Sequence, residues 1–475
     1  MPKPPAARTP RRKRGEGQWA LGYTEPLNKN EQSKTDDNPL NVRGRIINIY
    51  AKRGFDSIDP ADLRGRFRWM GLYTQRAPGF DGGKTASVPE EELDDRYFML
   101  RVRSDGKLLS PAAVRALGTI GQDFARDTAD VTDRANIQYH WIRVEDVPTI
   151  WDRLDEAGLS SLEACGDSPR PFLGSPVAGV ATDEIIDGSP ALDEIFRRYI
   201  GNPDFSNLPR KFKTAVTGHP SHDVSPETND VSFVGTVHPE HGPGFDLWVG
   251  GGLSTNPMLA QKLGVWIPLA DVPDVWEGVA SIFRDYGYRR LRSRARLKFL
   301  VADWGVEKFR EVLETEYLER ELVSNPSPVS PVGHRDHIGV HDQKDGKKYV
   351  GVAPTAGRVS GTMLAQLADL MDAHGIAGAR LTPYQKIVLI GVEPASVEQV
   401  EGFQVHLGGA TGLEANFGRK LRAHKVTSAG LDDYITVVVT NFLADRTEGE
   451  TFSAWVHRAD EELLRGERQL AASAS

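Results

Sequence analysis

Two stretches of this 475-residue chain repeat one order of strand, turn, helix and strand. The copies share a helix N-cap, a threonine and a glutamine: Ser110, Thr132 and Gln138 in the first, and Ser360, Thr382 and Gln385 in the second. In both copies the N-cap and the threonine are 22 residues apart. Order, caps and spacing together favour a duplicated α+β module over the coincidence of two ordinary α/β units.

Composition limits what such a chain can bind. Its single cysteine, Cys165, allows no internal disulfide, and no apolar run is long enough to span a membrane. The start of the chain is basic and proline-rich but lacks the apolar core of a secretory signal. We therefore predict a cytoplasmic protein. The net charge of −8 argues against a nucleic-acid partner, so any anion site must be local.

Polar side chains alternate along the stretch TDRANIQYH, which we interpret as a strand. One face of this strand would carry Thr132, Arg134, Asn136, Gln138 and His140. Such a face fits either a polar, multiply charged ligand or a solvated outer surface of a sheet. Arg101 and Arg103 alternate in the same way on the preceding strand, which favours the ligand.

Further cations follow in three segments. In NLPRKFK, Lys211 and Lys213 share one side of an extended chain, so they repel each other unless an anion lies between them. LWVGGGL predicts a glycine turn before a helix that opens at residues 256–257, where backbone N–H groups could face an anion. We read a further strand in RSRARLKFL, with alternating cations at Arg292, Arg294, Arg296 and Lys298. Solvated charge runs and a plain tight turn are the alternatives.

Taken together, these motifs resemble one enzyme family. TDRANIQYHW, LEACGDSPR, NLPRKFK, LWVGGGL, RSRARLKFL, YVGVAPTAGRVSG, LTPYQK and EGFQVHLGG look like the assimilatory sulfite/nitrite reductases, closest to the ferredoxin-dependent sulfite reductases of actinobacteria. The resemblance implies a pseudo-twofold α+β fold of two sulfite reductase repeats, with ferredoxin-like halves and α/β siroheme domains. It also implies siroheme and a [4Fe–4S] cluster, sulfite or nitrite as substrate, and ferredoxin as the electron donor.

The resemblance assigns roles to individual residues. The substrate anion would be bound, and protons relayed to it, by Arg101, Arg170, Lys211 and Lys213. The siroheme would be held by Arg134, Asn136, Gln138, Arg210, Arg294, Arg296 and Gln385, with Gln385 as the second-repeat counterpart of Gln138. Tyr73 and Cys165 match a tyrosine and a cysteine beside the siroheme, where we expect them to lie in contact and where a thioether link is chemically feasible.

The chain departs from the family at the cluster. The family carries four cluster cysteines in its second half, whereas this chain runs from LIGVEPASVEQV straight into EGFQVHLGG and has no cysteine beyond Cys165. We therefore predict a truncated third domain, no metal-ligating residues for the cluster, and impaired turnover. A ferredoxin-nitrite reductase, a non-catalytic siroheme-binding relative and an error in the gene sequence are the alternatives.

From these features we predict six segments and, because the duplication is internal, a monomer. The segments are a flexible basic arm (1–41), a first ferredoxin-like half (42–160), a siroheme and substrate domain (161–323), a linker (324–345), a second ferredoxin-like half (346–400), and a truncated third-domain remnant with C-terminal helices (401–475).

Overall fold

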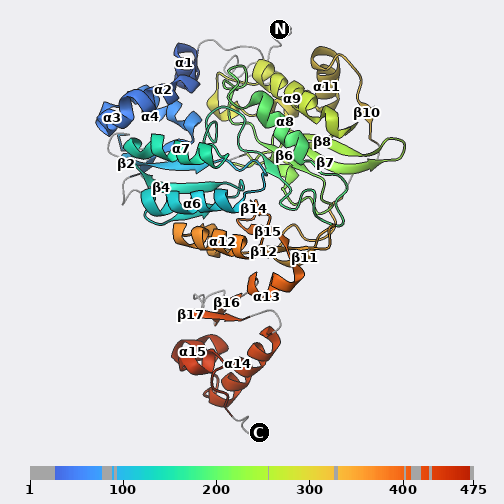
Figure 1. Cartoon of the computed structure of the whole chain (residues 1–475). Coiled ribbons are helices and arrows are strands. Elements are labelled where there is room, and N and C mark those ends of the chain that lie inside the picture. Colours follow the sequence, from blue (N-terminus) through green and yellow to red (C-terminus); the bar gives the residue numbers. More distant parts are fainter. Residues whose placement is uncertain are drawn as a thin grey trace. The chain divides into compact units, whose positions relative to one another are not determined.

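The computed structural model describes residues 27–76, 88–89, 94–254, 256–325, 330–400, 403–407, 419–426 and 430–470. The chain divides into two compact units, Met1–Val392 and Glu393–Ser475 (Figure 1). The first unit contains both predicted ferredoxin-like halves up to Val392, and the predicted end of the second half at residue 400 stays a prediction. No helix among these residues is both long enough and apolar enough to cross a bilayer.

Regular structure begins nearer the N-terminus than we predicted. Residues 1–26 of the expected arm lie outside the described residues, but helix α1 (Lys29–Asp36) is already in place within 1–41. Lys34 is 6% exposed and its Nζ lies 3.3 Å from Asp167, so the buried ion pair ties this helix to the domain. Three short helices follow: α2 (Val42–Arg45), α3 (Ala51–Arg53) and α4 (Pro60–Arg64).

The first half-module has the predicted strand, helix, strand, helix order. Its sheet has the order β1-β2-β4-β3-β13 and is formed by β1 (Leu72–Arg76), β2 (Asp94–Val102), β4 (Ile137–Ile142), β3 (Ala129–Val131) and β13 (Arg358–Val359). Its helices are α6 (Pro111–Phe124) and α7 (Val147–Glu156). Ser110 caps α6 by accepting a hydrogen bond from the Ala113 N–H, as the sequence predicted.

The second half-module repeats this plan. Its sheet has the order β11-β12-β15-β14, from β11 (Gly339–Asp342), β12 (Lys348–Val352), β15 (Ile387–Val392) and β14 (Gly378–Leu381). Helix α12 (Gly361–Ala373) is capped by Ser360, which accepts from the Met363 N–H.

Equivalent backbone pairings connect the two copies in both directions. Val359 pairs with Ala129 of the first copy, and Leu109 pairs with Ala379 of the second. Positions 109 and 359 differ by 250, as do positions 129 and 379, so each copy makes the same contact to the other. Helices α6 and α12 lie side by side (Figure 1). They approach closely at Gly118, where a Cβ would lie 2.7 Å from the carbonyl oxygen of Gly361. The predicted duplication is therefore confirmed.

The part of the sequence between the two half-modules forms a larger α/β domain. Its sheet runs β10-β9-β8-β7-β6-β5, from β10 (Val323–Ser324), β9 (Gln261–Ile267), β8 (Gly242–Val249), β7 (Val231–His238), β6 (Thr214–Thr217) and β5 (Leu173–Gly174). The helices are α8 (Ser189–Tyr199), α9 (Val272–Tyr286), α10 (Leu297–Trp304) and α11 (Val306–Val312). Trp276 of α9 is fully buried and packs against Tyr199, Phe205 and Phe212, which fixes the loops that precede β6.

Two predicted elements of this domain are wrong. The helix expected at residues 256–257 is absent, because the chain passes from the glycine turn through an irregular loop into β9. The strand expected over 292–298 is a 3₁₀ turn, Arg292–Arg294, followed by α10. At 292–298 the alternation of cations therefore came from a 3₁₀ turn and the start of a helix rather than from a pleated strand.

The second unit contains α13 (Val397–Val400), β16 (Phe403–Leu407), β17 (Arg419–Val426), α14 (Leu431–Asp445), α15 (Phe452–Arg458) and α16 (Glu461–Leu464). A small core forms around Trp455, which is fully buried. Helix α14 carries an apolar stripe of Ile435, Val439 and Leu443, four residues apart, with 49%, 43% and 54% exposed. A soluble helix normally buries such a stripe.

Candidate functional site

Arg101 lies where β2 pairs with β4. Its cross-strand partner is Gln138, whose Oε1 accepts a hydrogen bond from Arg101 Nη2 at 3.0 Å. The Arg101 Nε is buried without a hydrogen-bond partner. Arg103 differs, because its guanidinium is fully buried against Asp105 at 2.8 Å and belongs to the core. The sequence pattern therefore placed Arg101 and Gln138 together correctly, while Arg103 serves packing.

Arg134 lies in a turn and not on the strand that we predicted. Residues 132–136 connect β3 to β4, and Ala135 has a positive φ of 51°. The Arg134 side chain is 8% exposed and donates to Asn229 Oδ1 (2.5 Å) and to the carbonyl of Pro171 (2.7 Å). All of its acceptors are neutral, and its Nε has none. A buried guanidinium of this kind is costly unless an anion compensates it.

Arg170 and the two lysines come from adjacent loops. The Arg170 N–H donates to the carbonyl of Phe212 at 2.7 Å, and Arg170 Nε donates to the carbonyl of Gly166. Phe212 is fully buried, so Lys211 and Lys213 point to the opposite side of this extended segment. The prediction that these lysines share one side is confirmed.

Arg210, Arg294 and Arg296 surround the same segment. Arg210 Nη1 donates to the carbonyl of Arg292 at 3.0 Å, and the Arg294 guanidinium lies 4.7 Å from the ring centroid of Phe299. Arg296 is 6% exposed and forms an ion pair with Asp230 at 3.1 Å. Gly252 gives it room, because a Cβ there would lie 2.9 Å from Arg296 Nη2.

Six of these cations form what we call the cationic cluster: Arg101, Arg134, Arg170, Arg210, Lys211 and Lys213. Within the described part of the chain, none of the six forms an ion pair with a carboxylate, and the acceptors of the four arginines are amide or carbonyl oxygens. Asp230 adjoins the cluster, but its carboxylate is shared between Arg296 and the Lys213 backbone N–H. The cluster therefore carries a strong excess of positive charge.

This charge excess is visible in the pKa values. Burial, followed by repulsion from Arg170, lowers the pKa of Arg101 and brings that of Lys211 to about 8. Burial and the neighbouring Arg134 charge lower the pKa of Lys213 to about 7, and burial lowers that of Arg134 to about 10. A bound anion would raise every one of these pKa values, which is the behaviour expected of an anion site.

Tyr73 and Cys165 lie near the cluster but are not joined in the structure. Tyr73 sits on β1, with its ring 5.8 Å from the Arg68 guanidinium and close enough to Arg101 to interact with it electrostatically. The Cys165 thiol is fully buried, and the Cys165 carbonyl accepts from Ser168 Oγ at 3.1 Å. Contact between the two residues stays a prediction.

Two other predicted residues take different places. Asn136 is fully buried at the end of the turn: its Oδ1 accepts a long hydrogen bond from the Ser104 N–H at 3.4 Å, and its Nδ2 is buried without a hydrogen-bond partner. Gln385 is not the counterpart of Gln138. The Gln385 N–H bonds to Thr382 as the Ala135 N–H bonds to Thr132, and both residues have positive φ, so Gln385 matches Ala135. Its Nε2 donates to the carbonyl of Val131 at 3.1 Å and joins the two copies.

Sequence reasoning missed Asp230 and Asn229, which partner the buried arginines. Their signal was the polar pair directly before the apolar strand VSFVG, where a buried carboxylate needs a cation.

Comparisons with known proteins agree with this arrangement. The family model for the nitrite/sulfite reductase ferredoxin-like half domain matches residues 90–157 and 341–402. The model for the nitrite and sulphite reductase 4Fe-4S domain matches residues 165–322, a stretch in which Cys165 is the one cysteine. The ferredoxin-like model thus matches both copies of the duplicated module.

Individual relatives cover nearly the whole chain. The sulfite reductase (ferredoxin) of Mycobacterium tuberculosis strain H37Rv is 51% identical over 553 residues, covering 96% of this chain and 99% of the relative. The assimilatory ferredoxin-dependent nitrite reductase of Haloferax mediterranei is 34% identical, covering 78% and 66%. The solved structure of the Mycobacterium tuberculosis NirA protein superposes with a TM-score of 0.77 at 51% identity, covering 94% of this chain and 99% of that one.

The alignment length itself is informative. Covering 96% of 475 residues uses about 456 residues of this chain, whereas the alignment to the Mycobacterium tuberculosis relative extends over 553, so about 97 aligned positions have no residue here.

Proposed function

The chain belongs to the nitrite and sulfite reductase family, and we propose that it is a ferredoxin-dependent sulfite reductase by descent whose cationic cluster holds siroheme and the substrate anion. The observation that carries this proposal is the set of six buried or half-buried cations with no carboxylate partner among the described residues. Two of them, Arg101 and Arg134, each keep a buried Nε without an acceptor. Siroheme has eight carboxylates, which fit such a set.

Within this proposal the residues divide the work. Arg134 and Arg210, together with Gln138, Arg294 and Arg296, would hold the macrocycle carboxylates, while Arg101, Arg170, Lys211 and Lys213 would bind the anion. With pKa values of about 8 and 7, Lys211 and Lys213 can hold or release a proton at Nζ near neutral pH. When bound, siroheme would supply an iron that can bind the anion and pass on to it the electrons received from the donor.

The iron–sulfur cluster does not fit the residues present. A [4Fe–4S] cluster needs four thiolates, and the chain has one cysteine, which is buried beside the first half-module. We propose that the positions missing from the alignment include the cluster ligands. The exposed stripe of Ile435, Val439 and Leu443 supports this, because it is what a helix would present after losing the segment that covered it. A non-catalytic siroheme-binding protein is therefore the second candidate function.

A chimera tests the proposal. We expect this chain to make no sulfide from sulfite with reduced ferredoxin, because electrons have no cluster to enter through. Inserting the segment that the Mycobacterium tuberculosis relative carries, between Val400 and Glu401, should restore acid-labile sulfide and sulfide production. The matched control is the same chimera with its inserted cysteines changed to serine, which should stay inactive. Turnover by the unmodified chain at the rate of the chimera would contradict the proposal.

We also propose ferredoxin as the donor, sulfite in preference to nitrite, and a cytoplasmic monomer. The names of the 51% identical relatives support sulfite and ferredoxin, whereas the relatives named nitrite reductase are less similar. Competition between sulfite and nitrite in the active chimera tests the substrate, and sedimentation equilibrium against the 52.3 kDa chain mass tests the oligomeric state.

A further inference from the structure

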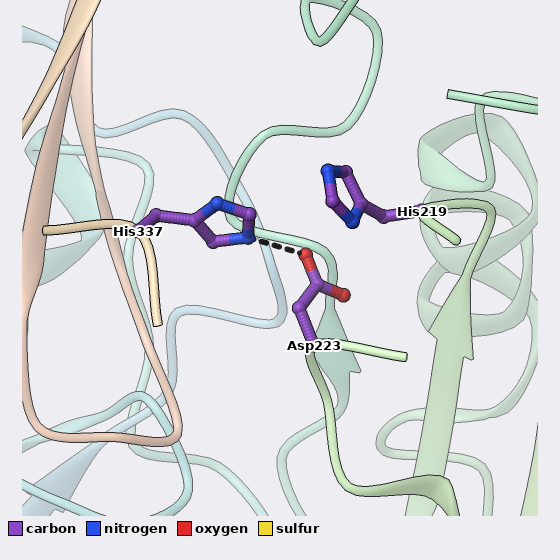
Figure 2. Close-up of side chains that lie close together, drawn as sticks. All are labelled: His219, Asp223 and His337. Atoms are coloured by element: carbon purple, nitrogen blue, oxygen red, sulfur yellow. Dashed lines mark hydrogen bonds and ion pairs between the residues drawn. The ribbon is translucent and has the colours of Figure 1, made fainter. Parts of the chain in front are cut away.

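A second group of ligand-type side chains lies outside the cationic cluster. His219 follows β6, Asp223 lies in the loop after it, and His337 belongs to the segment that leads into β11 (Figure 2). Their exposed fractions are 7%, 0% and 4%. One potential metal-ligating atom from each residue lies within 4.8 Å of the others. Two buried ligand-type residues of one loop and a third from more than 100 residues later in the sequence therefore lie together.

Neighbouring side chains orient these ligands. Asp223 Oδ2 is 2.9 Å from His337 Nε2 and accepts from Ser175 Oγ at 2.7 Å, while Asp223 Oδ1 accepts from Thr217 Oγ1 at 2.7 Å. The two imidazole rings stand at 88° with their centroids 4.9 Å apart. Hydrogen bonds from neighbouring side chains that hold a ligand carboxylate in place are typical of metal sites.

The other groups facing His219 are Ser221 and Asp183. His219 Nδ1 lies 2.8 Å from Ser221 Oγ, and His219 Nε2 lies 3.3 Å from Asp183 Oδ1. The Asp183 side chain is 60% exposed, so this edge of the group opens toward solvent and offers a further oxygen. A solvent-facing carboxylate therefore adjoins the buried group.

Charge balance favours an ion. Asp223 is a fully buried carboxylate that contacts the hydroxyls of Ser175 and Thr217 and a histidine that is charged only if protonated. A buried anion is costly unless a cation compensates it. Two imidazoles and one carboxylate form a donor set that suits zinc and similar divalent ions.

We propose that His219, Asp223 and His337 bind one divalent ion of the zinc class, which fastens the segment between the two halves to the α/β domain. The same segment is already attached just before His337, by the Val332 N–H to the carbonyl of Pro220 at 2.9 Å and by Arg335 to Glu227 at 2.5 Å. The ion would complete this attachment, so its role is structural and separate from sulfite reduction.

Zinc binding by the full chain tests this inference. After treatment with a chelator, the protein is dialysed against buffered Zn²⁺, and zinc is measured per chain by elemental analysis, which separates it from siroheme iron. We expect one zinc per chain and a thermal midpoint raised by a few degrees. His337→Gln retains a hydrogen-bond donor for Asp223 but should weaken zinc binding roughly 100-fold or more.

The matched control is His334→Gln, an exposed histidine three residues earlier in the same segment, which should bind zinc as the wild type does. If His337→Gln does not fold, His219→Gln gives the same comparison from the α/β domain. The proposal would be overturned if His337→Gln and His219→Gln bound zinc with the affinity of the wild type, or if the wild type bound no zinc at all. The three residues would then be a hydrogen-bonded contact without a metal. These zinc measurements do not require sulfite reduction by the chimera that carries the iron–sulfur cysteines.

Discussion

Replacing Asp230 by asparagine should lower the free energy of unfolding by about 3–5 kcal/mol, the usual cost of removing one partner of a buried ion pair. Asp230 is fully buried, pairs with Arg296 at 3.1 Å and accepts from the Lys213 N–H at 2.9 Å. Without its charge, Arg296 would join the cationic cluster as another uncompensated cation. Chemical denaturation of the siroheme-free protein, followed by tryptophan fluorescence, measures the change.

Asp369→Asn is the matched control for this prediction. Asp369 pairs with Arg115 at 2.5 Å, but its side chain is 68% exposed, so we expect a loss of at most about 1 kcal/mol. If Asp230→Asn lowered the free energy of unfolding as little as Asp369→Asn does, the buried cations would not be destabilised by losing this carboxylate. That result would remove the main argument for an anionic ligand.

Replacing both Lys211 and Lys213 by methionine should have two effects of opposite sign. Sulfite binding to the siroheme-loaded protein should weaken roughly 100-fold or more, because two charge-assisted hydrogen bonds of about 1.5–3 kcal/mol each are lost. The siroheme-free protein should become more stable to denaturation, because two cations that are disfavoured by burial and by neighbouring charges are removed. Calorimetric titration and thermal melting give the two readings.

Lys52→Met, at an exposed lysine on α3, is the control and should change neither quantity. Lower stability of the double variant together with unchanged sulfite affinity would show that the lysines serve packing rather than anion binding.

The same lysines set the pH dependence. Their folded-state pKa values, about 8 for Lys211 and about 7 for Lys213, lie below the ordinary value of 10.5, so the unfolded chain binds more protons between these limits. The stability of the siroheme-free protein should therefore rise as pH increases from about 7 toward 10. Sulfite affinity should fall over the same range, because the lysines lose their charge.

Local sequence signals predicted the parts of the fold that depend on neighbours in the chain. Ser110 and Ser360 cap their helices because a side-chain oxygen before a helix satisfies a free N–H whatever the tertiary structure. Lys211 and Lys213 share a side because Phe212 between them must be buried. These features follow from period and composition alone.

The errors came from loops that wrap a charged site. The alternation at 132–136 and at 292–298 is produced by turns, so it mimics a strand while presenting cations in another geometry. Gln385 was matched to Gln138 by residue type, whereas the hydrogen bonds of the turn match it to Ala135. The pairing of Asp230 with Arg296 and that of Asp223 with His337 could not be predicted, because these partners lie far apart in the sequence.

Iron and acid-labile sulfide per chain, with an absorption spectrum, test the central claim most directly when the protein is expressed together with siroheme synthesis. The account predicts siroheme bands, iron equal to siroheme, and no labile sulfide, because the cationic cluster is present and the cluster thiolates are not. Labile sulfide at roughly four per siroheme would show that a [4Fe–4S] cluster is bound after all and would contradict the account.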